Sequence, residues 1–312
     1  MPHPLSILTG PDAAADWSAA WTTFELRCQA LALSERTLGW YKDRLNAFQR
    51  FLREAGVAPA PGEVTPMHLR AFLASLRERG ARHGTMDGSW RSLRTLFGYL
   101  HSDGYLPSNP GLGIPRPRGT KPVMPALRED QVRALLDAPD RKAWVGLRDY
   151  TLLVLFLDTA LRLSEALGLT LGDVDLANGM LTVMGKGRKG RQVPMGRVAR
   201  RALVRWLQRR GDVPGQDLVF CTRTGDRLKA RHVQSQFHRL SRKAGIEGVN
   251  VTPHALRHTA ATMYLRQGGN PLMLQRLLGH STLAMTNRYL QAVGADDLRN
   301  AHRTASPMDG LG

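Results

Sequence analysis

The sequence predicts a mainly α-helical protein with two helical domains and one small antiparallel β-sheet. Three observations favour this fold class. Apolar residues recur at helical spacing through most of the 312 residues. Prolines and glycines gather between residues 107 and 125, where they favour extended chain between two domains. A β-hairpin pattern occurs at residues 179–194, where a turn rich in Gly, Lys and Arg separates two short arms.

The first domain is expected to be a helical bundle over residues 13–106. Helices are predicted at Trp17–Leu31, at Glu35–Ala55, from Thr65 to Gly80 and around Trp90 to Gly104. Ser34 is a suitable N-cap for the second helix, and Thr65-Pro66 gives the third a cap followed by proline. The aromatic residues of this bundle are expected to fill its core rather than to stack on bases.

Residues 107–125 are expected to form an extended linker. This segment carries three basic residues, Arg116, Arg118 and Lys121. They either follow a phosphate backbone, if the two domains enclose a duplex, or belong to a solvated tether. The sequence leaves both interpretations open.

The second domain is predicted over residues 126–305, and residues 306–312 are expected to be a tail. Helices are expected at Arg128–Ala138, Lys142–Ala160, Arg197–Arg210 and Ala230–Gly245, and again within Thr252–Leu290. The hairpin lies between the second and third of these helices. This domain is therefore expected to be mostly helical around one small sheet.

The chain is strongly basic, and its charge is uneven. The net charge is +18 at pH 7. Residues 1–120 hold 14 Lys+Arg against 10 Asp+Glu, a balance of +4, whereas residues 121–312 hold 30 against 16, a balance of +14. Because phosphate contacts release counterions, this favours a nucleic-acid partner. The alternative, on charge alone, is a basic surface that binds nothing.

Other classes of protein are disfavoured. No apolar run reaches the roughly 18 residues of a membrane helix. The N-terminus lacks the basic-then-apolar pattern of a secretory signal. Cys28 and Cys221 lie far apart and form no disulfide or metal-binding pattern. A protein of the reducing cytoplasm is expected.

Charged residues in unusual settings are the first candidates for chemistry. Arg162 lies between two leucines, where a charge is costly unless it has a partner or a function; a salt bridge to Glu165 would explain it equally well. Lys186 lies in GKGRKGR, where glycines let the backbone approach a ligand, although a flexible basic turn is the alternative. No P-loop pattern is present, so nucleotide binding is disfavoured. The neighbouring cations are predicted to position phosphates: Arg188, Lys189 and Arg191.

Histidines, an arginine and a tyrosine follow near the C-terminal end. His254 and Arg257 are three residues apart, so they share one face at a helix N-terminus, where anions are favoured. His258 is expected to point elsewhere. His280 lies at a helix junction, and Tyr289 lies in the helix that follows. No HExxH and no cysteine cluster accompany the histidines, so a metal is not expected. Taken singly, a histidine or tyrosine here would more often be structural.

Together these residue types provide what metal-free cleavage of a phosphodiester requires. Tyr289 offers an oxygen nucleophile, whose intrinsic pKa of about 10 demands a base or a strong cationic field. Arginines suit the non-bridging oxygens because their planar fork binds phosphate bidentately. A lysine can protonate the leaving 5′ oxygen. The chain lacks an acidic cluster for magnesium, which disfavours a two-metal mechanism, and no cofactor is expected.

At these residues the sequence resembles the tyrosine site-specific recombinases, the phage integrase and Xer group. TALRLSE is similar to the family's first arginine box, and VMGKGRKGRQVPM is similar to its β-hairpin lysine box. PHALRHTAAT resembles the HxxR box, and LLGHSTLAMTNRYL resembles the last box. The resemblance implies six catalytic residues: Arg162, Lys186, His254, Arg257, His280 and the nucleophile Tyr289. One departure is Ala160, where the family commonly has glycine.

The resemblance also implies a fold and a reaction. The fold is a SAM-like core-binding domain followed by a catalytic domain of the DNA breaking-rejoining type, together forming a C-shaped clamp on DNA. Tyr289 attacks a scissile phosphate and becomes 3′-phosphotyrosyl. The two arginines and His280 stabilise the non-bridging oxygens, His254 handles the tyrosine proton, and the lysine protonates the 5′-hydroxyl.

The implied partner is double-stranded DNA with specific recombination sites. Four protomers, as a homo-tetramer or with a second recombinase, exchange strands through a Holliday junction. No arm-binding domain is visible. The tail resembles Xer-type C-termini, which implies that Ala295–Arg303 docks on a neighbouring subunit. Relaxation by a type IB topoisomerase and DNA binding without catalysis are the alternatives. Dimer resolution and mobile-element movement are both compatible with the sequence.

Overall fold

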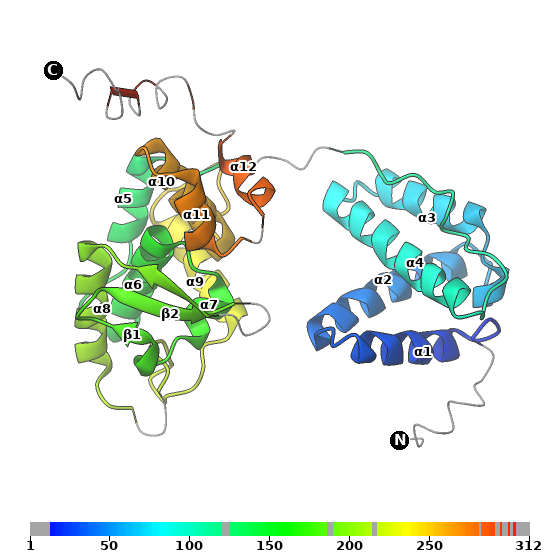
Figure 1. Cartoon of the computed structure of the whole chain (residues 1–312), viewed down its shortest axis with the longest axis horizontal. Coiled ribbons are helices and arrows are strands. Elements are labelled where there is room, and N and C mark those ends of the chain that lie inside the picture. The colour runs from blue at the N-terminus through cyan, green and yellow to red at the C-terminus, as the bar shows by residue number, and fades with distance from the viewer. Residues whose placement is uncertain are drawn as a thin grey trace. The chain divides into compact units, whose positions relative to one another are not determined.

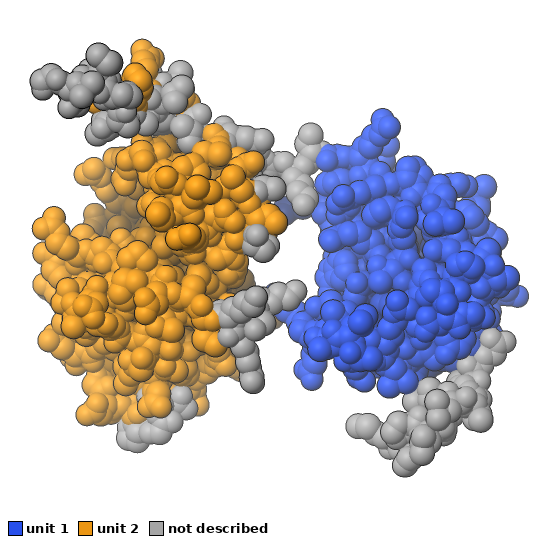
Figure 2. Space-filling view, viewed as in Figure 1, with its two compact units in different colours: residues 1–122 blue, residues 123–312 orange. Residues whose placement is uncertain are grey.

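Helices dominate the structure, which confirms the predicted fold class (Figure 1). The computed structural model describes residues 13–119, 125–185, 190–213, 217–280 and 282–290, and the separate positions 294, 299, 302 and 303. The chain divides into two compact units, residues 1–122 (unit 1) and residues 123–312 (unit 2), shown in Figure 2. The division falls inside the segment predicted as a linker.

In its described residues, unit 1 is a bundle of four α-helices. They are α1 (Trp17–Ala30), α2 (Glu35–Glu54), α3 (Pro66–Glu78) and α4 (His83–Ser102), with the 3-10 turn η2 (Pro61–Glu63) before α3. Asp16 and Ser34 cap α1 and α2, because their side chains accept hydrogen bonds from the backbone of the first turn. Thr65 and Pro66 begin α3 as predicted.

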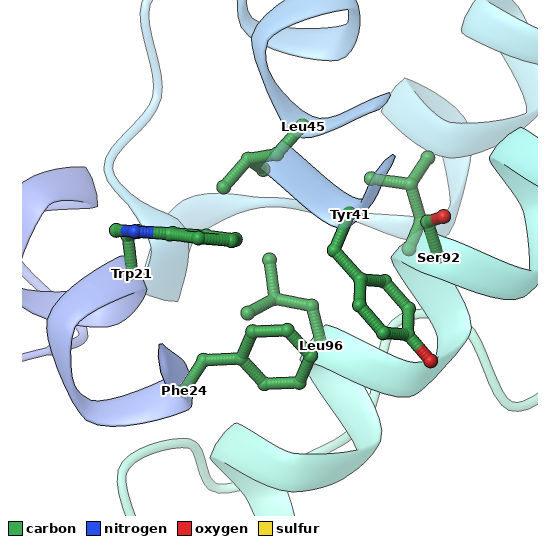
Figure 3. A pocket seen from close by; sticks show the side chains of 7 residues that line it. Trp21, Phe24, Tyr41, Leu45, Ser92 and Leu96 are labelled. Carbon is green, nitrogen blue, oxygen red and sulfur yellow. The ribbon is translucent and has the colours of Figure 1, made fainter. Parts of the chain in front are cut away.

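Aromatic rings fill the core of unit 1. Phe24, Phe48 and Phe97 are almost fully buried. Rings from different helices meet edge to face, as for Phe48 and Phe72, whose centroids are 5.3 Å apart. A void of about 10 Å³ lies between α1, α2 and α4. Figure 3 shows the mostly apolar side chains that line it. Because the void is no more than the space of one water, the rings have the core role that was predicted.

Two tryptophans of unit 1 differ from this pattern. Arg91 lies over the ring of Trp40 and Arg94 over the ring of Trp90, at 5.6 and 5.3 Å from the ring centroids. These side chains line an open hollow of about 390 Å³. Cation–π attraction holds the guanidinium groups against the rings, so this part of the bundle presents cations in fixed positions.

The first part of the predicted linker packs on unit 1. Ile114 is buried, and its carbonyl oxygen accepts a hydrogen bond from Trp90 Nε1 at 3.1 Å. Arg116 donates from Nε and Nη2 to the two carboxylate oxygens of Asp87, at 2.6 and 3.1 Å. These hydrogen bonds hold the pKa of the buried Asp87 below its ordinary value. Apolar and ionic contacts therefore hold the start of this segment against α4.

In its described residues, unit 2 surrounds a three-stranded antiparallel sheet with helices. The elements are α5 (Glu129–Asp137), α6 (Trp144–Thr159), α7 (Leu163–Gly168), η3 (Leu171–Asp173), β1 (Val174–Asp175), β2 (Met180–Met184), β3 (Gly190–Pro194), α8 (Arg197–Arg210), α9 (Ala230–Lys243), α10 (Pro253–Arg266), α11 (Pro271–Leu278) and α12 (Ala284–Leu290). The strand order is β1-β2-β3, with Leu181 opposite Val193. β2 and β3 form the predicted hairpin. β1 was not predicted, because two residues are too few to show alternation.

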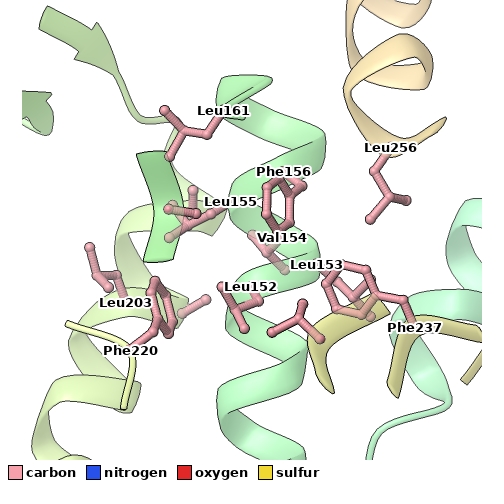
Figure 4. Close-up of a cluster of buried hydrophobic side chains, with 14 of the residues drawn as sticks. Leu152, Leu153, Val154, Leu155, Phe156, Leu161, Leu203, Phe220, Phe237 and Leu256 are labelled. Carbon is pink, nitrogen blue, oxygen red and sulfur yellow. The ribbon is translucent and has the colours of Figure 1, made fainter. Parts of the chain in front are cut away.

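The apolar helix α6 passes through the core of unit 2. Residues 152–156 are at most 4% exposed. Leu203 of α8, Phe237 of α9 and Leu256 of α10 belong to the same cluster (Figure 4). A helix that is apolar on all sides has to be covered on all sides, so α6 fixes the helices that carry the site. No helix in the described residues is long and apolar enough to cross a membrane.

Candidate active site

Several predicted site residues meet at an open pocket in unit 2. The pocket has a volume of about 870 Å³ and lies between α7, the ends of β2 and β3, and the chain between α11 and α12. Its lining combines charged groups, glycines and two methionines: Arg162, Ser164, Glu165, Met184, Gly185, Gly190, Arg191, Gly279, His280 and Met285. Gly185 and Gly190 flank the predicted lysine turn, so both ends of that turn belong to the pocket wall.

Arg162 forms a salt bridge with Glu165, which was the structural alternative to a catalytic role. Its Nη1 donates to Glu165 Oε1 and its backbone N–H to Oε2, both at 2.8 Å. The backbone bond is half of a capping box, which starts α7 at this residue. Arg162 Nη2 also lies 3.4 Å from the carbonyl oxygen of Gly279. The Arg162 side chain is still 39% exposed, so part of the guanidinium faces the pocket despite the salt bridge.

Glu165 is shared with Arg191 of β3. Arg191 Nη1 and Nη2 donate to the two Glu165 oxygens at 2.7 and 3.0 Å, and its Nε donates to the Leu277 carbonyl oxygen at 3.0 Å. Burial raises the pKa of Glu165, but the hydrogen bonds from Arg191 and Arg162 outweigh it, so the net pKa is lowered. Arg191 thereby links the hairpin, α7 and the end of α11. All three of its nitrogen atoms are engaged inside the protein, and its predicted phosphate contact stays a prediction.

Arg257 is buried at the centre of the cluster. It is 4% exposed, and it donates from Nη1 to the Ala160 carbonyl oxygen at 2.6 Å and from Nη2 to the Leu278 carbonyl oxygen at 2.7 Å. Ala160 ends α6 in the left-handed region, with φ 50° and ψ 33°, which favours glycine. Burial lowers the pKa of Arg257 to about 10, so the guanidinium remains protonated at neutral pH.

His280 and Tyr289 stack beside Arg257. His280 Nε2 lies 3.4 Å from Arg257 Nη2, and His280 Nδ1 lies 3.0 Å from Thr286 Oγ1. The rings of His280 and Tyr289 are nearly parallel, with 8° between their planes and 6.2 Å between their centroids. Tyr289 is fully buried among apolar residues of α10 and α11. The predicted nucleophile therefore lies in a core cluster behind the pocket.

His258 also contacts Tyr289, although the sequence analysis expected it to point elsewhere. This expectation is wrong: His258 is buried, and its ring centroid lies 5.2 Å from that of Tyr289. Residues 255–262 are all buried, so α10 has partners on most of its circumference and the side chain next to Arg257 meets α12. The sequence signal for this burial was that residues 255–262 contain, apart from Arg257 and His258, only alanine, leucine and threonine. His254, one turn earlier, is exposed.

The remaining predicted residues divide into two groups. One group lies outside the described residues: Lys121, Lys186, Arg188 and Lys189. Most of the predicted docking helix Ala295–Arg303 and the tail 306–312 also lie outside them. The other group belongs to unit 1, where Arg116 pairs with Asp87 and Arg118 is exposed. Among the described residues, no three His, Cys, Asp or Glu side chains gather in a group that could hold a metal ion.

Comparison with protein families gives a match in each unit. The model of the phage integrase family matches residues 125–294. The model of the phage integrase N-terminal SAM-like domain matches residues 28–104. The first match alone spans more than half of the chain and includes every residue of the pocket.

Individual relatives match along most of the chain. The tyrosine recombinase XerC of Oceanobacillus iheyensis is 33% identical over 280 residues, which cover 88% of this chain and 91% of the relative. The XerC of Alcanivorax borkumensis is 36% identical over 263 residues, 82% and 85% of the two chains. Among solved structures, a lambda integrase tetramer bound to a Holliday junction matches with a TM-score of 0.72 at 18% identity, over 92% of this chain and 81% of that one. This last likeness is one of fold.

Proposed function

Because the chain belongs to the phage integrase family of tyrosine recombinases, we propose that Tyr289 is the nucleophile with which it cuts and rejoins DNA. The family makes the chain a DNA strand transferase that carries out site-specific recombination. The observation that supports Tyr289 is its contact with His280, which in turn contacts Arg257 beside the pocket.

The proposed reaction exchanges one phosphodiester for another. The Tyr289 oxygen attacks the phosphorus, the bond to the 5′ oxygen breaks, and a 3′-phosphotyrosyl link and a free 5′-hydroxyl result. Attack by the 5′-hydroxyl of the partner strand then releases the tyrosine. Tyr289 is fully buried, so a phosphate cannot reach its oxygen in this conformation. Movement of α12 away from α10 is therefore a step of the proposed reaction.

Arg162, Arg257 and His280 are proposed to hold the non-bridging oxygens. Arg162 and His280 line the pocket, and Arg257 contacts His280. Glu165 and two backbone carbonyls orient the guanidinium groups before any substrate binds. Donors fixed in advance stabilise developing charge without reorganisation at the moment of reaction. The cluster thus supplies both charge and geometry.

His254 and Lys186 are proposed to transfer protons. His254 is exposed on the first turn of α10, where it would accept the phenolic proton once α12 has moved. Lys186 follows Gly185, which lines the pocket, and would protonate the leaving 5′ oxygen. His258 is proposed to hold Tyr289 in its buried resting position, because the two rings are in contact there.

Duplex DNA carrying a specific site is the proposed partner. Four basic residues are proposed to contact phosphates: Arg118, Lys121, Arg188 and Lys189. The lambda integrase structure is a tetramer on a Holliday junction, and we propose the same stoichiometry here, as a homo-tetramer or with a second recombinase. Since the chain is 33% identical to an XerC over 91% of that relative, we propose an Xer-type role at the nucleoid, either resolving chromosome or plasmid dimers or moving a mobile element.

A nicked suicide duplex in EDTA tests this proposal. Because the site sequence has to be found as well, the duplexes are prepared from a genomic fragment library. The wild type is expected to give a covalent protein–DNA band on a denaturing gel, linked to a 3′ phosphate. Tyr289→Phe keeps the ring and its packing, so it is expected to bind DNA without giving the band. Absence of the band from the wild type across the library would favour DNA binding without catalysis.

A further inference from the structure

The outer face of α8 carries arginines that the recombination chemistry does not use. Arg197, Arg201, Arg205 and Arg209 are all exposed and follow one another at intervals of four residues. At about 1.5 Å per residue they lie along roughly 18 Å of helix. Within the described residues none of the four has a carboxylate partner, whereas Arg128, Arg133 and Arg141 of the same unit each pair with a nearby Asp or Glu.

The stability of α8 does not explain this composition. Cations are unfavourable near a helix N-terminus, yet Arg197 is the first residue of α8, and Arg200 and Arg201 are its fourth and fifth residues. Like charges four residues apart also repel one another. The apolar residues that attach α8 to the core, such as Leu203 and Trp206, lie on its other face. Arg209, in the last turn, is favoured by the helix dipole, but Arg197 and Arg201 near the first turn weaken the isolated helix, and an anionic ligand would offset their charge.

The surface beside these arginines is shaped like a groove. An open groove of about 770 Å³ runs between α8 and Tyr150 of α6. Arg197, Arg201 and Arg205 line it, and Val198 is an exposed apolar side chain within it. A protein interface would need a buried aromatic or aliphatic centre. Apolar side chains such as Val198 and Val204 also line this groove, but a row of cations along one helix face fits the phosphates of a nucleic acid better than an acidic protein.

The groove is separate from the candidate active site. Arg162, His280 and the hairpin glycines line the pocket, and none of them belongs to α8 or lines the groove. In Figure 1, α8 lies at the edge of unit 2 opposite α7 and α12, with the sheet and α6 between. A duplex in the pocket would therefore leave α8 free to contact another one.

We propose that α8 binds a second segment of duplex DNA through its phosphates, without reading sequence, while the pocket holds the segment being cut. This inference takes from the proposed function only that the substrate is DNA. It implies that each protomer contacts two duplex segments.

Capture of a second duplex tests the proposal with the full-length chain. Protein is bound to a bead-anchored duplex, unbound protein is washed away, and a fluorescent duplex of unrelated sequence is added. The variant Arg197→Gln/Arg201→Gln/Arg205→Gln is compared with Arg53→Gln/Arg70→Gln/Arg77→Gln. The second variant removes the same charge from exposed arginines of α2 and α3.

The proposal expects the wild type and the unit 1 variant to capture the second duplex. The α8 variant should capture at least about ten-fold less, and the slope of log affinity against log salt should fall by about 2.7, for three phosphates at roughly 0.9 each. Equal capture by all three proteins would overturn the proposal, as would an equal loss in both variants. Release of the α8 variant from the bead would also overturn it, because α8 would then belong to the first DNA site.

Two further measurements keep the outcomes distinct. Labelled poly-glutamate replaces the second duplex; binding of poly-glutamate without capture of duplex would indicate an acidic protein partner and contradict the proposal. The suicide-duplex assay is run on the α8 variant, which should form the covalent complex at the wild-type rate. A chain that captures the second duplex but never forms a covalent complex would overturn the proposed function and leave this inference intact.

Discussion

Two groups of arginines in unit 2 have opposite surroundings. At the pocket, Arg162 and Arg191 donate to a shared carboxylate, and beside it the buried Arg257 donates to backbone carbonyls. On α8, arginines such as Arg201 are exposed and, within the described residues, have no acidic partner. A guanidinium held by its neighbours has a defined geometry, whereas an exposed one keeps its rotamer freedom and provides charge alone. An arginine whose geometry is fixed by hydrogen-bond partners is therefore a candidate for catalysis, whereas an exposed arginine without an acidic partner is a candidate for binding anions through its charge alone.

The largest expected difference between the two groups is in the rate of cleavage. Arg257→Ala should lower the single-turnover rate of covalent complex formation by about 10²–10³, the scale of a lost oxyanion donor. Arg257→Lys keeps the charge but cannot bridge the carbonyls of Ala160 and Leu278, so it should also be slow. Arg201→Ala should react at nearly the wild-type rate. Similar rates for Arg257→Ala and Arg201→Ala would remove the distinction.

The second-largest expected effect is on the free energy of unfolding. Arg191→Ala leaves the buried Glu165 with Arg162 alone, and should lower the free energy of unfolding in urea by about 2–3 kcal/mol, somewhat less than a fully broken buried pair. Adding Glu165→Gln should restore part of this loss, because the uncompensated carboxylate is gone. Arg133→Ala is the control: its pair with Glu129 is exposed and should contribute about 0–1 kcal/mol. Equal losses in Arg191→Ala and Arg133→Ala would contradict the role given to Arg191.

The same buried carboxylate predicts a pH dependence. The pKa of Glu165 is lowered in the folded chain, below the unfolded value of about 4.3. Its contribution to stability is therefore complete above about pH 4.3 and is lost as the pH falls through the folded pKa. Urea midpoints measured between about pH 5 and pH 3 should fall less steeply in Glu165→Gln than in the wild type. Parallel pH profiles for the wild type and Glu165→Gln would show that Glu165 titrates alike in the folded and unfolded chains.

The smallest expected effect is a change in stability at Ala160, whose carbonyl oxygen accepts a hydrogen bond from Arg257. Ala160 has φ 50°, so Ala160→Gly should relieve the left-handed backbone and raise the stability by about 0.5–1 kcal/mol. Ala32 in unit 1 has φ 52° but is exposed, so Ala32→Gly loses no buried methyl group and should stabilise by at least as much. Thermal unfolding measures both. A loss of stability in Ala160→Gly would mean that the methyl group contributes more than the strain removes.

Local signals in the sequence predicted most of the fold. Capping residues such as Ser34 and Thr65 marked where helices begin, and the apolar run before Ala160 marked the buried helix α6. The sequence motifs, taken in chain order, identified the arginines, histidines and tyrosine as candidate site residues. These signals extend over one helix or one turn, which is why they predicted the elements; the roles given to the site residues stay predictions.

Contacts between distant segments were not predictable in this way. The burial of Tyr289 and its contact with His258 depend on packing between α10 and α12. Arg191 was predicted as a phosphate contact, and Arg116 as either a phosphate contact or part of a solvated tether, because both are cations near glycines or prolines. Their carboxylate partners lie 29 and 26 residues away in the sequence, beyond the reach of a local pattern.

Identification of the residue that becomes attached to DNA tests the central claim most directly. The covalent complex is digested with nuclease and protease, and the peptides are analysed by mass spectrometry. The account predicts a nucleotide adduct on Tyr289, joined through a 3′ phosphate, even though this side chain is fully buried in the resting structure. An adduct on any other residue, with Tyr289 unmodified, would contradict it.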